Sequence, residues 1–298
     1  MLAMFLLFLL AEPAIAVKGA RFGLMLWANR LLPSLLPFMI LTQILIRSGY
    51  LDAFTQKFCI SYPYLVLFSG TLFGFPMGCK LTVDLYDCGK LSDEEASFLF
   101  IITNQMSPAF VGGYILSETL HRSELIPITY LIFYGPSVLY GLVKLRILSR
   151  KRPAHENHKA KKSTSGLQMN TAILDAGIMN SLETMLKLGC YIMLFSILTE
   201  MCSHFFSEFP AFRTLIAGLL EVTGAVSAID LFFTDARLTY IALLAATAFG
   251  GCSGIAQTAS LIRSHKTSSA LSLTSYIKGR LLVAAVTVAL ALAVCLFL

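Results

Sequence analysis

The fold is indicated by two stretches of the sequence, LVLFSGTLFGFPMGCKLTVDLYDCGK at residues 65–90 and IALLAATAFGGCSGIAQTASLIRSHK at residues 241–266. They align without a gap, and two pairs of glycines coincide: Gly74 with Gly250, and Gly78 with Gly254. Small residues at every fourth position allow helices to pack closely in lipid. They also suit paired helices that break near the middle of a membrane, as in transporters. We favour broken helices, because Pro76 deletes a backbone hydrogen bond; close packing alone is the alternative.

The composition indicates a membrane protein. Hydrophobic residues make up 56% of the 298 residues and charged residues 13%, and the mean hydropathy is +0.74. A soluble protein carries roughly 25% charged residues because its surface faces water. The composition therefore excludes a soluble enzyme, a disordered tail and a secreted disulfide scaffold. At about 20 apolar residues per spanning helix, the chain supports at most about eight spans.

We therefore expect an all-α polytopic membrane protein with two related halves and broken or re-entrant helices. The first transmembrane half covers residues 1–148, with a core repeat at about 31–148, and the second covers 171–298. Residues 1–17 are expected to form a retained first helix, although the Ala-x-Ala pattern at 14–16 leaves cleavage of residues 1–16 open. Residues 18–30 suit a helix at the membrane interface. The remaining apolar segments are 31–46, 64–86, 96–116, 125–148, 185–206, 212–233, 238–262 and 281–298.

A basic linker at residues 149–170 separates the halves. Residues 144–162 contain eight Lys or Arg and one Glu, a net charge of +7 against −1 for the rest of the chain. Such a loop beside an apolar segment is typical of the cytoplasmic side of a membrane, and the charge does not indicate nucleic-acid binding. Counting back through four spans places Lys18, Arg21 and Arg30 on the same side.

The topology of the second half has two solutions. If residues 212–233 are re-entrant, the loop with Arg263, His265 and Lys266 is cytoplasmic and the repeats are parallel. If they cross fully, that loop lies outside and the repeats are inverted, as in many transporters. The positive-inside rule favours the first solution. We lean towards the second, and leave the choice open.

Polar groups within apolar segments are costly, so they are candidates for a functional site. Lys80 and Asp84, like Glu183 and Lys187, are four residues apart and can pair on one helix face. We expect a substrate between the two glycine runs. The candidate substrate-binding residues are Gly74, Pro76, Gly78, Lys80, Asn104, Ser107, Glu221, Thr223, Gly250, Ser253, Gly254 and Gln257.

No motif indicates an enzyme, a cofactor or a metal. The two histidines of His155-Glu-Asn-His158 are three apart in a lysine-rich loop, whereas a zinc protease helix needs a spacing of four. The seven cysteines form no Cys-x-x-Cys pair, and most lie in apolar runs as small hydrophobic residues. We expect no catalytic residue, no cofactor and no metal site.

Four motifs resemble the sporulation integral membrane protein YlbJ family, which belongs with the nucleoside-recognition, or Gate, domain membrane proteins. They are Leu32-Pro-Ser-Leu-Leu-Pro37-Phe38, Gly74-Phe-Pro-Met-Gly78-Cys-Lys80, Asn104-x-x-Ser107-Pro108-x-Phe110 and Gly218-Leu-Leu-Glu-Val-Thr223-Gly. The resemblance runs from about residue 20 to about 290. Phe75 and Cys79 depart from it, since family members tend to have Tyr and often Ala there.

This resemblance implies a fold similar to concentrative nucleoside transporters and a role in endospore formation, where the sporulation member is associated with passing dipicolinate into the forespore. We expect a transporter of a small, anionic, dipicolinate-like solute, located in the bacterial cell membrane or the forespore membrane. The alternatives are a non-transporting scaffold of a sporulation complex and a nucleoside-type carrier. The expected partners are the lipid bilayer and the solute, without nucleic acid. A homo-oligomer or other sporulation membrane proteins are left open, as are the coupling ion and the direction of transport.

Overall fold

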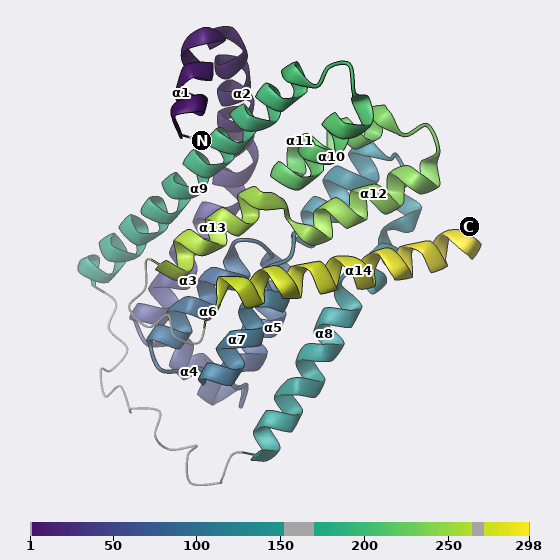
Figure 1. Ribbon diagram of the computed structural model, residues 1–298. Helices are drawn as coiled ribbons and strands as arrows, with labels where there is room; N and C mark the ends of the chain where they lie inside the picture. The colour runs from purple at the N-terminus through teal and green to yellow at the C-terminus, as the bar shows by residue number, and fades with distance from the viewer. Residues whose placement is uncertain (1, 152–169, 264–270, 298) are drawn as a thin grey trace.

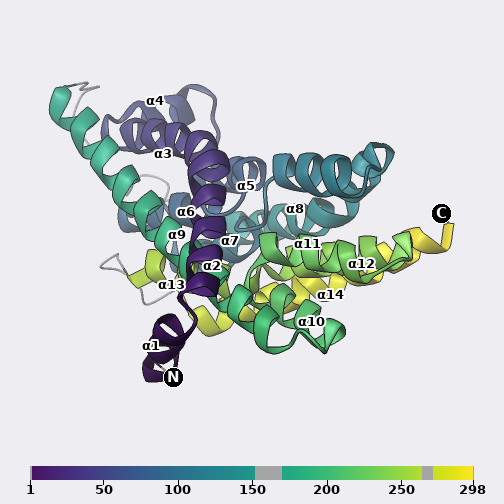
Figure 2. The ribbon, with the colours of Figure 1, turned by 90° about the horizontal axis from the view of Figure 1, so that it is seen from above.

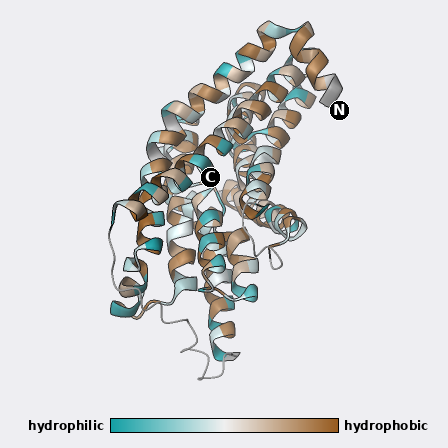
Figure 3. Ribbon diagram, turned by 90° about the vertical axis from the view of Figure 1, so that its left-hand side faces the viewer, coloured by the Kyte–Doolittle hydropathy of each residue, from teal (hydrophilic) through white to brown (hydrophobic). Residues whose placement is uncertain are grey.

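The computed structural model describes residues 2–151, 170–263 and 271–297, and every regular element in these ranges is a helix (Figure 1). The helical polytopic fold is thus confirmed for this part of the chain. Hydrophobic residues cover much of the length of the helices, and hydrophilic ones gather near several helix ends (Figure 3). Four helices are long and apolar enough to cross a membrane: Ser123–Arg150, Thr171–Phe205, Ala236–Arg263 and Leu273–Leu296.

The N-terminal segments differ from the prediction. The chain forms α1 (Leu2–Ala11) and then α2 (Pro13–Leu26), so the single helix predicted over residues 1–17 is wrong. A turn of π-helix, η1 (Trp27–Leu31), joins α2 directly to α3 (Leu32–Arg47). The separate interfacial helix predicted over residues 18–30 is also wrong, because α2 packs along α9 (Thr171–Phe205). The sequence does not reveal this contact, which requires a partner helix 150 residues away.

The α2–α3 segment runs antiparallel to α9. Lys18 forms an ion pair with Glu200 near the end of α9, whereas a Cβ at Gly177, near its start, would lie 3.1 Å from Ile44. Because α9 begins just after the linker, Lys18 lies at the end of the molecule that is far from the linker. The prediction that Lys18 shares the side of the linker is therefore wrong.

Lys18 lies away from the linker because one of the predicted spans of the first half is a helical hairpin. After α4 (Tyr50–Lys57), helices α5 (Tyr62–Phe73) and α6 (Met77–Asp87) fold back and pack against each other. Lys90 Nζ lies 2.6 Å from Asp52 Oδ2, which ties the end of the hairpin to α4 beside its start. Twelve residues of helix extend about 18 Å, less than the roughly 30 Å of a bilayer core. The segment 64–86 therefore enters and leaves on the linker side instead of crossing.

The segment that follows crosses in two pieces. Helix α7 (Asp93–Ile102) starts with a capping box, since Ser92 and Glu95 exchange side-chain and backbone hydrogen bonds. Residues 103–107 are not helical, and the π-helix η2 (Ala109–Thr119) continues away from the linker side. After η3 (Ser123–Leu125), α8 (Ile126–Lys151) returns to the linker, of which residues 152–169, with the His155–His158 pattern, lie outside the described residues.

The second half repeats this order of elements in the opposite direction. Helix α9 leaves the linker side and starts 14 residues before the predicted segment 185–206. Helices α10 (Pro210–Leu220) and α11 (Val222–Phe232) then form a hairpin that enters from the far side. Helices α12 (Ala236–Phe249) and α13 (Gly251–Arg263) cross towards the linker side. Helix α14 (Leu273–Phe297) returns beside α12 (Figures 1 and 2).

Residues 212–233 do not form one spanning helix but the two short helices α10 and α11, and the first half contains a hairpin as well. Whether the repeats are parallel or inverted stays a prediction. Ser260 and Leu261 near the end of α13 line a small cavity together with Lys187, on the linker half of α9. Arg263 thus lies on the linker side, against our expectation, while His265 and Lys266 lie outside the described residues.

Cysteine labelling tests these directions. We expect cysteines at Ser163 in the linker and at the exposed Ser272 to react with a membrane-impermeant thiol reagent from the same side. A cysteine at the exposed Ser207, after α9, should react only from the other side. If the linker is cytoplasmic, Ser207→Cys alone is labelled in intact cells. Labelling of Ser272→Cys and Ser207→Cys from one side would contradict the arrangement.

Candidate functional site

The first helix break lies at the tip of the α5–α6 hairpin. Gly74 ends α5 with φ +68°, a conformation that favours glycine. The Phe75 N–H donates a hydrogen bond of 2.5 Å to the carbonyl of Gln105, within the non-helical segment of α7–η2. A Cβ at Gly74 would lie 2.5 Å from the backbone nitrogen of Ser107. The hairpin tip therefore packs directly against the break in the following helix.

The second break repeats this contact on the other half. Glu221 separates α10 from α11 in an extended conformation, and its carboxylate caps α11 by accepting from the Gly224 N–H at 2.8 Å and from the Thr223 hydroxyl. Gly250 and Gly251, with φ +87° and +69°, interrupt α12–α13. A Cβ at Gly251 would lie 3.1 Å from the carbonyl oxygen of Leu220. Each hairpin tip thus meets the break of the helix that follows it.

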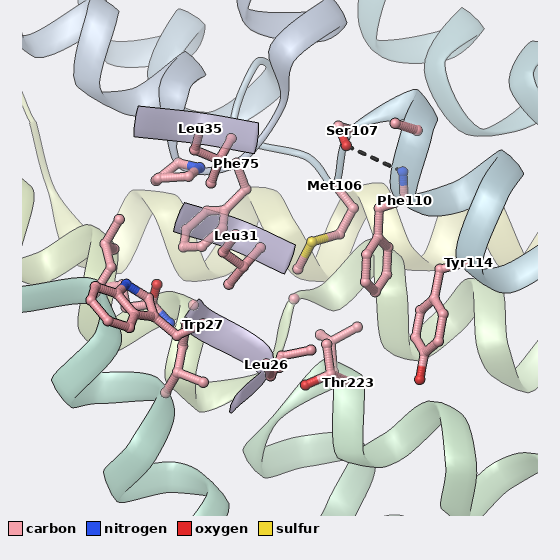
Figure 4. A pocket seen from close by; sticks show the side chains of 18 of the residues that line it. Leu26, Trp27, Leu31, Leu35, Phe75, Met106, Ser107, Phe110, Tyr114 and Thr223 are labelled. Carbon is pink, nitrogen blue, oxygen red and sulfur yellow. Dashed lines mark hydrogen bonds between the residues drawn. The ribbon is translucent and has the colours of Figure 1, made fainter. Parts of the chain in front are cut away.

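Both tips and both breaks border one cavity of about 470 Å³, within the range of small-molecule sites. We call it the central cavity. Figure 4 shows Phe75 and Met106 from the first half opposite Thr223 from the second, with the neighbouring rings of Phe110 and Tyr114 at one side. The two rings have centroids 5.3 Å apart. Trp27 and Leu31 of η1 close another side (Figure 4).

Eight of the twelve predicted site residues line the central cavity. Four helices, α6, η2, α11 and α13, begin at the breaks, so their N-terminal backbone amides lie near it. The role of these residues in binding stays a prediction. They are Pro76, Ser107, Glu221, Thr223, Gly250, Ser253, Gly254 and Gln257.

The other four predicted residues make packing contacts, an ion pair or hydrogen bonds near the cavity. They are Gly74, Gly78, Lys80 and Asn104. Gly74 packs against Ser107, and Gly78 packs against Thr103. Lys80 is 3% exposed and pairs with Asp84 at 2.7 Å, which confirms the predicted intrahelical pair. Asp84 also accepts a hydrogen bond from Gln43.

Asn104 joins the two halves instead of facing the cavity. Its Nδ2 donates to Thr258 Oγ1 and to the Tyr276 hydroxyl, both at 3.0 Å. Its Oδ1 has no hydrogen-bond partner among the described residues. The second predicted pair, Glu183 and Lys187, is confirmed at 2.6 Å, on the exposed surface of α9.

Sequence reasoning missed several residues at the site. Trp27 was assigned to the interface, but its indole N–H donates to the Met185 carbonyl at 2.9 Å and its ring covers Gly189. Arg280 was placed before the last span, but it is 1% exposed in α14. Its guanidinium donates to the carbonyls of Ala248 and Phe249, the last two residues of α12. A charged residue within an apolar helix is the signal that could have identified it.

The described ranges contain no group of three or more His, Cys, Asp or Glu residues able to hold an ion. Among the described side chains that line the central cavity, the charged ones are Glu118 and Glu221. The surroundings are otherwise apolar and aromatic, with hydroxyl and amide groups from Ser107, Thr223 and Gln257. This lining can hold a small, flat molecule between apolar faces and orient it by a few hydrogen bonds.

The comparisons support the resemblance seen in the motifs. The chain is similar to the sporulation integral membrane protein YlbJ of Bacillus subtilis (strain 168), with 28% identity over 231 residues. The match covers 68% of this chain and 56% of that relative, so it spans little more than half the length of the relative. No protein-family profile and no solved structure matches the chain. The similarity and the apolar helices identify an integral membrane protein.

Proposed function

We propose that this protein transports a small aromatic solute across the membrane, in connection with endospore formation. The observation that carries the proposal is the central cavity, which forms where two hairpin tips and two helix breaks meet. Backbone that leaves its helix at membrane depth is stable only against protein or in a water-filled cavity. Transporters place their substrate at such breaks. The link to sporulation rests on the name of the similar protein.

The order of elements supports a relation to concentrative nucleoside transporters, as the resemblance implies. Each half contains a helix, a hairpin, an interrupted helix and a final helix, and the halves run in opposite directions. We infer inverted repeats, with α5–α6 equivalent to α10–α11 and α7–η2 equivalent to α12–α13. This correspondence differs from the gap-free alignment, which pairs the α5–α6 hairpin with the interrupted helix α12–α13.

Two classes of solute fit the cavity. The N-termini of α6, η2 and α13 favour a carboxylate, which supports a dipicolinate-like dianion. Lys80 was expected at the substrate site but does not line the cavity, and neither does Lys187, so neither lysine supplies positive charge there. Glu118 and Glu221 instead favour an uncharged, nucleobase-like molecule with N–H donors. We place the dipicolinate-like solute first because three helix N-termini converge on one cavity.

Uptake by the purified protein in proteoliposomes tests the function. We expect radiolabelled dipicolinate to accumulate above protein-free liposomes and to be displaced by unlabelled dipicolinate more effectively than by uridine. Phe110→Ala should weaken uptake by roughly tenfold, since a ring stacked on a flat solute contributes about 1–1.5 kcal/mol. Phe98→Ala, whose ring packs on Tyr140 outside the central cavity, is the control. Absence of flux of either solute would favour the non-transporting scaffold.

A further inference from the structure

A second cavity of about 760 Å³ lies between α2, α9 and the α10–α11 hairpin. We call it the outer vestibule, because it lies at the end of α9 that is far from the linker. Its outer part is bordered by Lys18 and Glu200, whose side chains form an ion pair and are 73% and 28% exposed. Arg213, at the start of α10, lines it as well. The vestibule therefore reaches the polar edge of the molecule.

Polar side chains occur along the length of the outer vestibule, between apolar ones. Hydroxyl side chains from α9 recur at the spacing of one helix face, and Ser227 of α11 adds another from the hairpin. A row of hydroxyl and charged groups in a spanning helix is costly in lipid, but it is stable against water. The polar side chains of the lining are Lys18, Ser196, Thr199, Glu200, Ser203, His204, Ser207, Arg213, Glu221 and Ser227.

The inner end of the vestibule contains an unsatisfied hydroxyl. Ser196 is 4% exposed, and its Oγ has no hydrogen-bond partner among the described residues. Buried polar atoms are nearly always hydrogen-bonded to protein or to ordered water. This hydroxyl is itself covered, because it lies in the contact between α2 and α9: a Cβ at Gly23 would lie 2.8 Å from it. The cavity outside this contact has room for water and borders charged groups at its outer end.

One turn of helix separates the vestibule from the central cavity. Glu221 lines both cavities, Thr223 lines the central cavity, and Gly224 lines the vestibule. The Glu221 carboxylate holds this turn closed by accepting hydrogen bonds from the Thr223 hydroxyl and the Gly224 N–H. The turn is the first turn of α11, at the tip of a hairpin whose helices have only 11 residues each. The first turn of α11 therefore lies between the two cavities, at the tip of a short hairpin.

We propose that the outer vestibule is the aqueous route by which the solute reaches the central cavity from the side opposite the linker, and that the first turn of α11, held by Glu221, is the barrier between them. The route rests on the proposed transport function. The presence of water in the vestibule does not, because it is inferred from the size of the cavity and from its polar side chains alone.

Cysteine accessibility in a transport-competent variant that lacks the seven native cysteines tests the route. Thr199→Cys on α9 and Ser227→Cys on α11 place thiols in the vestibule. Leu194→Cys is the matched control, because Leu194 lies on α9 and is 41% exposed on the lipid-facing surface. The probe is a positively charged, membrane-impermeant methanethiosulfonate, which reacts only with thiols that ionise in water. Ser163→Cys reports the linker side.

We expect Thr199→Cys and Ser227→Cys to react at least about tenfold faster than Leu194→Cys, since lipid excludes water from the control thiol. The reaction should occur from the side opposite Ser163→Cys, and the bulky adduct should block uptake. Reaction no faster than the control, or only from the linker side, would overturn the vestibule. Fast reaction without loss of uptake would overturn its role as the route. Fast labelling of a protein that transports neither solute would leave the hydrated vestibule intact and reject the proposed function instead.

Discussion

Gly78→Ala should prevent the α5–α6 hairpin from closing against α7. A Cβ at residue 78 would lie 2.0 Å from the carbonyl oxygen of Thr103 and 2.5 Å from its carbonyl carbon. Real Cβ atoms do not approach backbone atoms so closely, so the hairpin must move away from the break at residues 103–107. We expect a loss of about 3 kcal/mol in the free energy of unfolding, at the upper end of overpacking effects.

Gly254→Ala is the matched control, because Gly254 also lies one turn after a break. A Cβ at residue 254 meets no atom within 4 Å. Alanine in this helix should be neutral or should stabilise it by about 0.5–1 kcal/mol. The measurement is the thermal unfolding of the detergent-purified variants, followed by the loss of the monodisperse peak on a sizing column. Equal stability of Gly78→Ala and the parent protein would contradict the packing at the hairpin tip.

Lys80→Met should destabilise the fold rather than only abolish transport. Lys80 and Asp84 are 3% and 8% exposed, and the substitution removes the cation that neutralises Asp84 inside the protein. Loss of one partner from a buried ion pair costs about 3–5 kcal/mol. The double variant Lys80→Met, Asp84→Leu should recover most of this stability, since no buried charge then remains.

Lys187→Met is the comparison, because it removes one partner of an ion pair with the same spacing on the exposed surface. Its ion pair with Glu183 also spans four residues of helix, but the side chains are 46% and 66% exposed. Its loss should cost less than about 1 kcal/mol. Protein yield, thermal unfolding and dipicolinate uptake together distinguish the roles of Lys80. A stable Lys80→Met variant that inserts normally but does not transport would contradict the structural role and indicate that Lys80 binds the substrate.

The sequence was most informative where local chemistry decides the structure. The breaks at Gly74 and Gly250 follow from backbone conformations that glycine favours, and the cap at Ser92 follows from hydrogen bonds within four residues. Eight of the predicted site residues line one cavity because they flank these breaks. Their polarity within apolar segments was the signal.

Long-range geometry could not be predicted in the same way. A break in an apolar segment does not reveal whether the chain continues, as at Gly250, or folds back, as at Gly74, because the partner helix makes the difference. Because the chain folds back at Gly74, the number of crossings in the first half changes, and with it the side on which Lys18 lies. The position of Trp27 could not be predicted for the same reason. A tryptophan beside basic residues suits the membrane interface, but it suits packing against Gly189 of α9 equally well.

The position of Arg280 in the chain has a consequence for the order in which the protein is completed. The carbonyl groups at the end of α12 receive the guanidinium of Arg280 from α14, which is synthesised after α12. Until α14 has been inserted, the oxygens of Ala248 and Phe249 lack this partner at the centre of the molecule. The half of the site around Gly74 depends less on α14, because residues 74–107 already contain its tip and its break, and only Asn104 in that break waits for the Tyr276 hydroxyl. A chain that lacks α14 therefore keeps the contact between the first tip and its break, whereas the carbonyl groups at the second break lack the guanidinium that binds them.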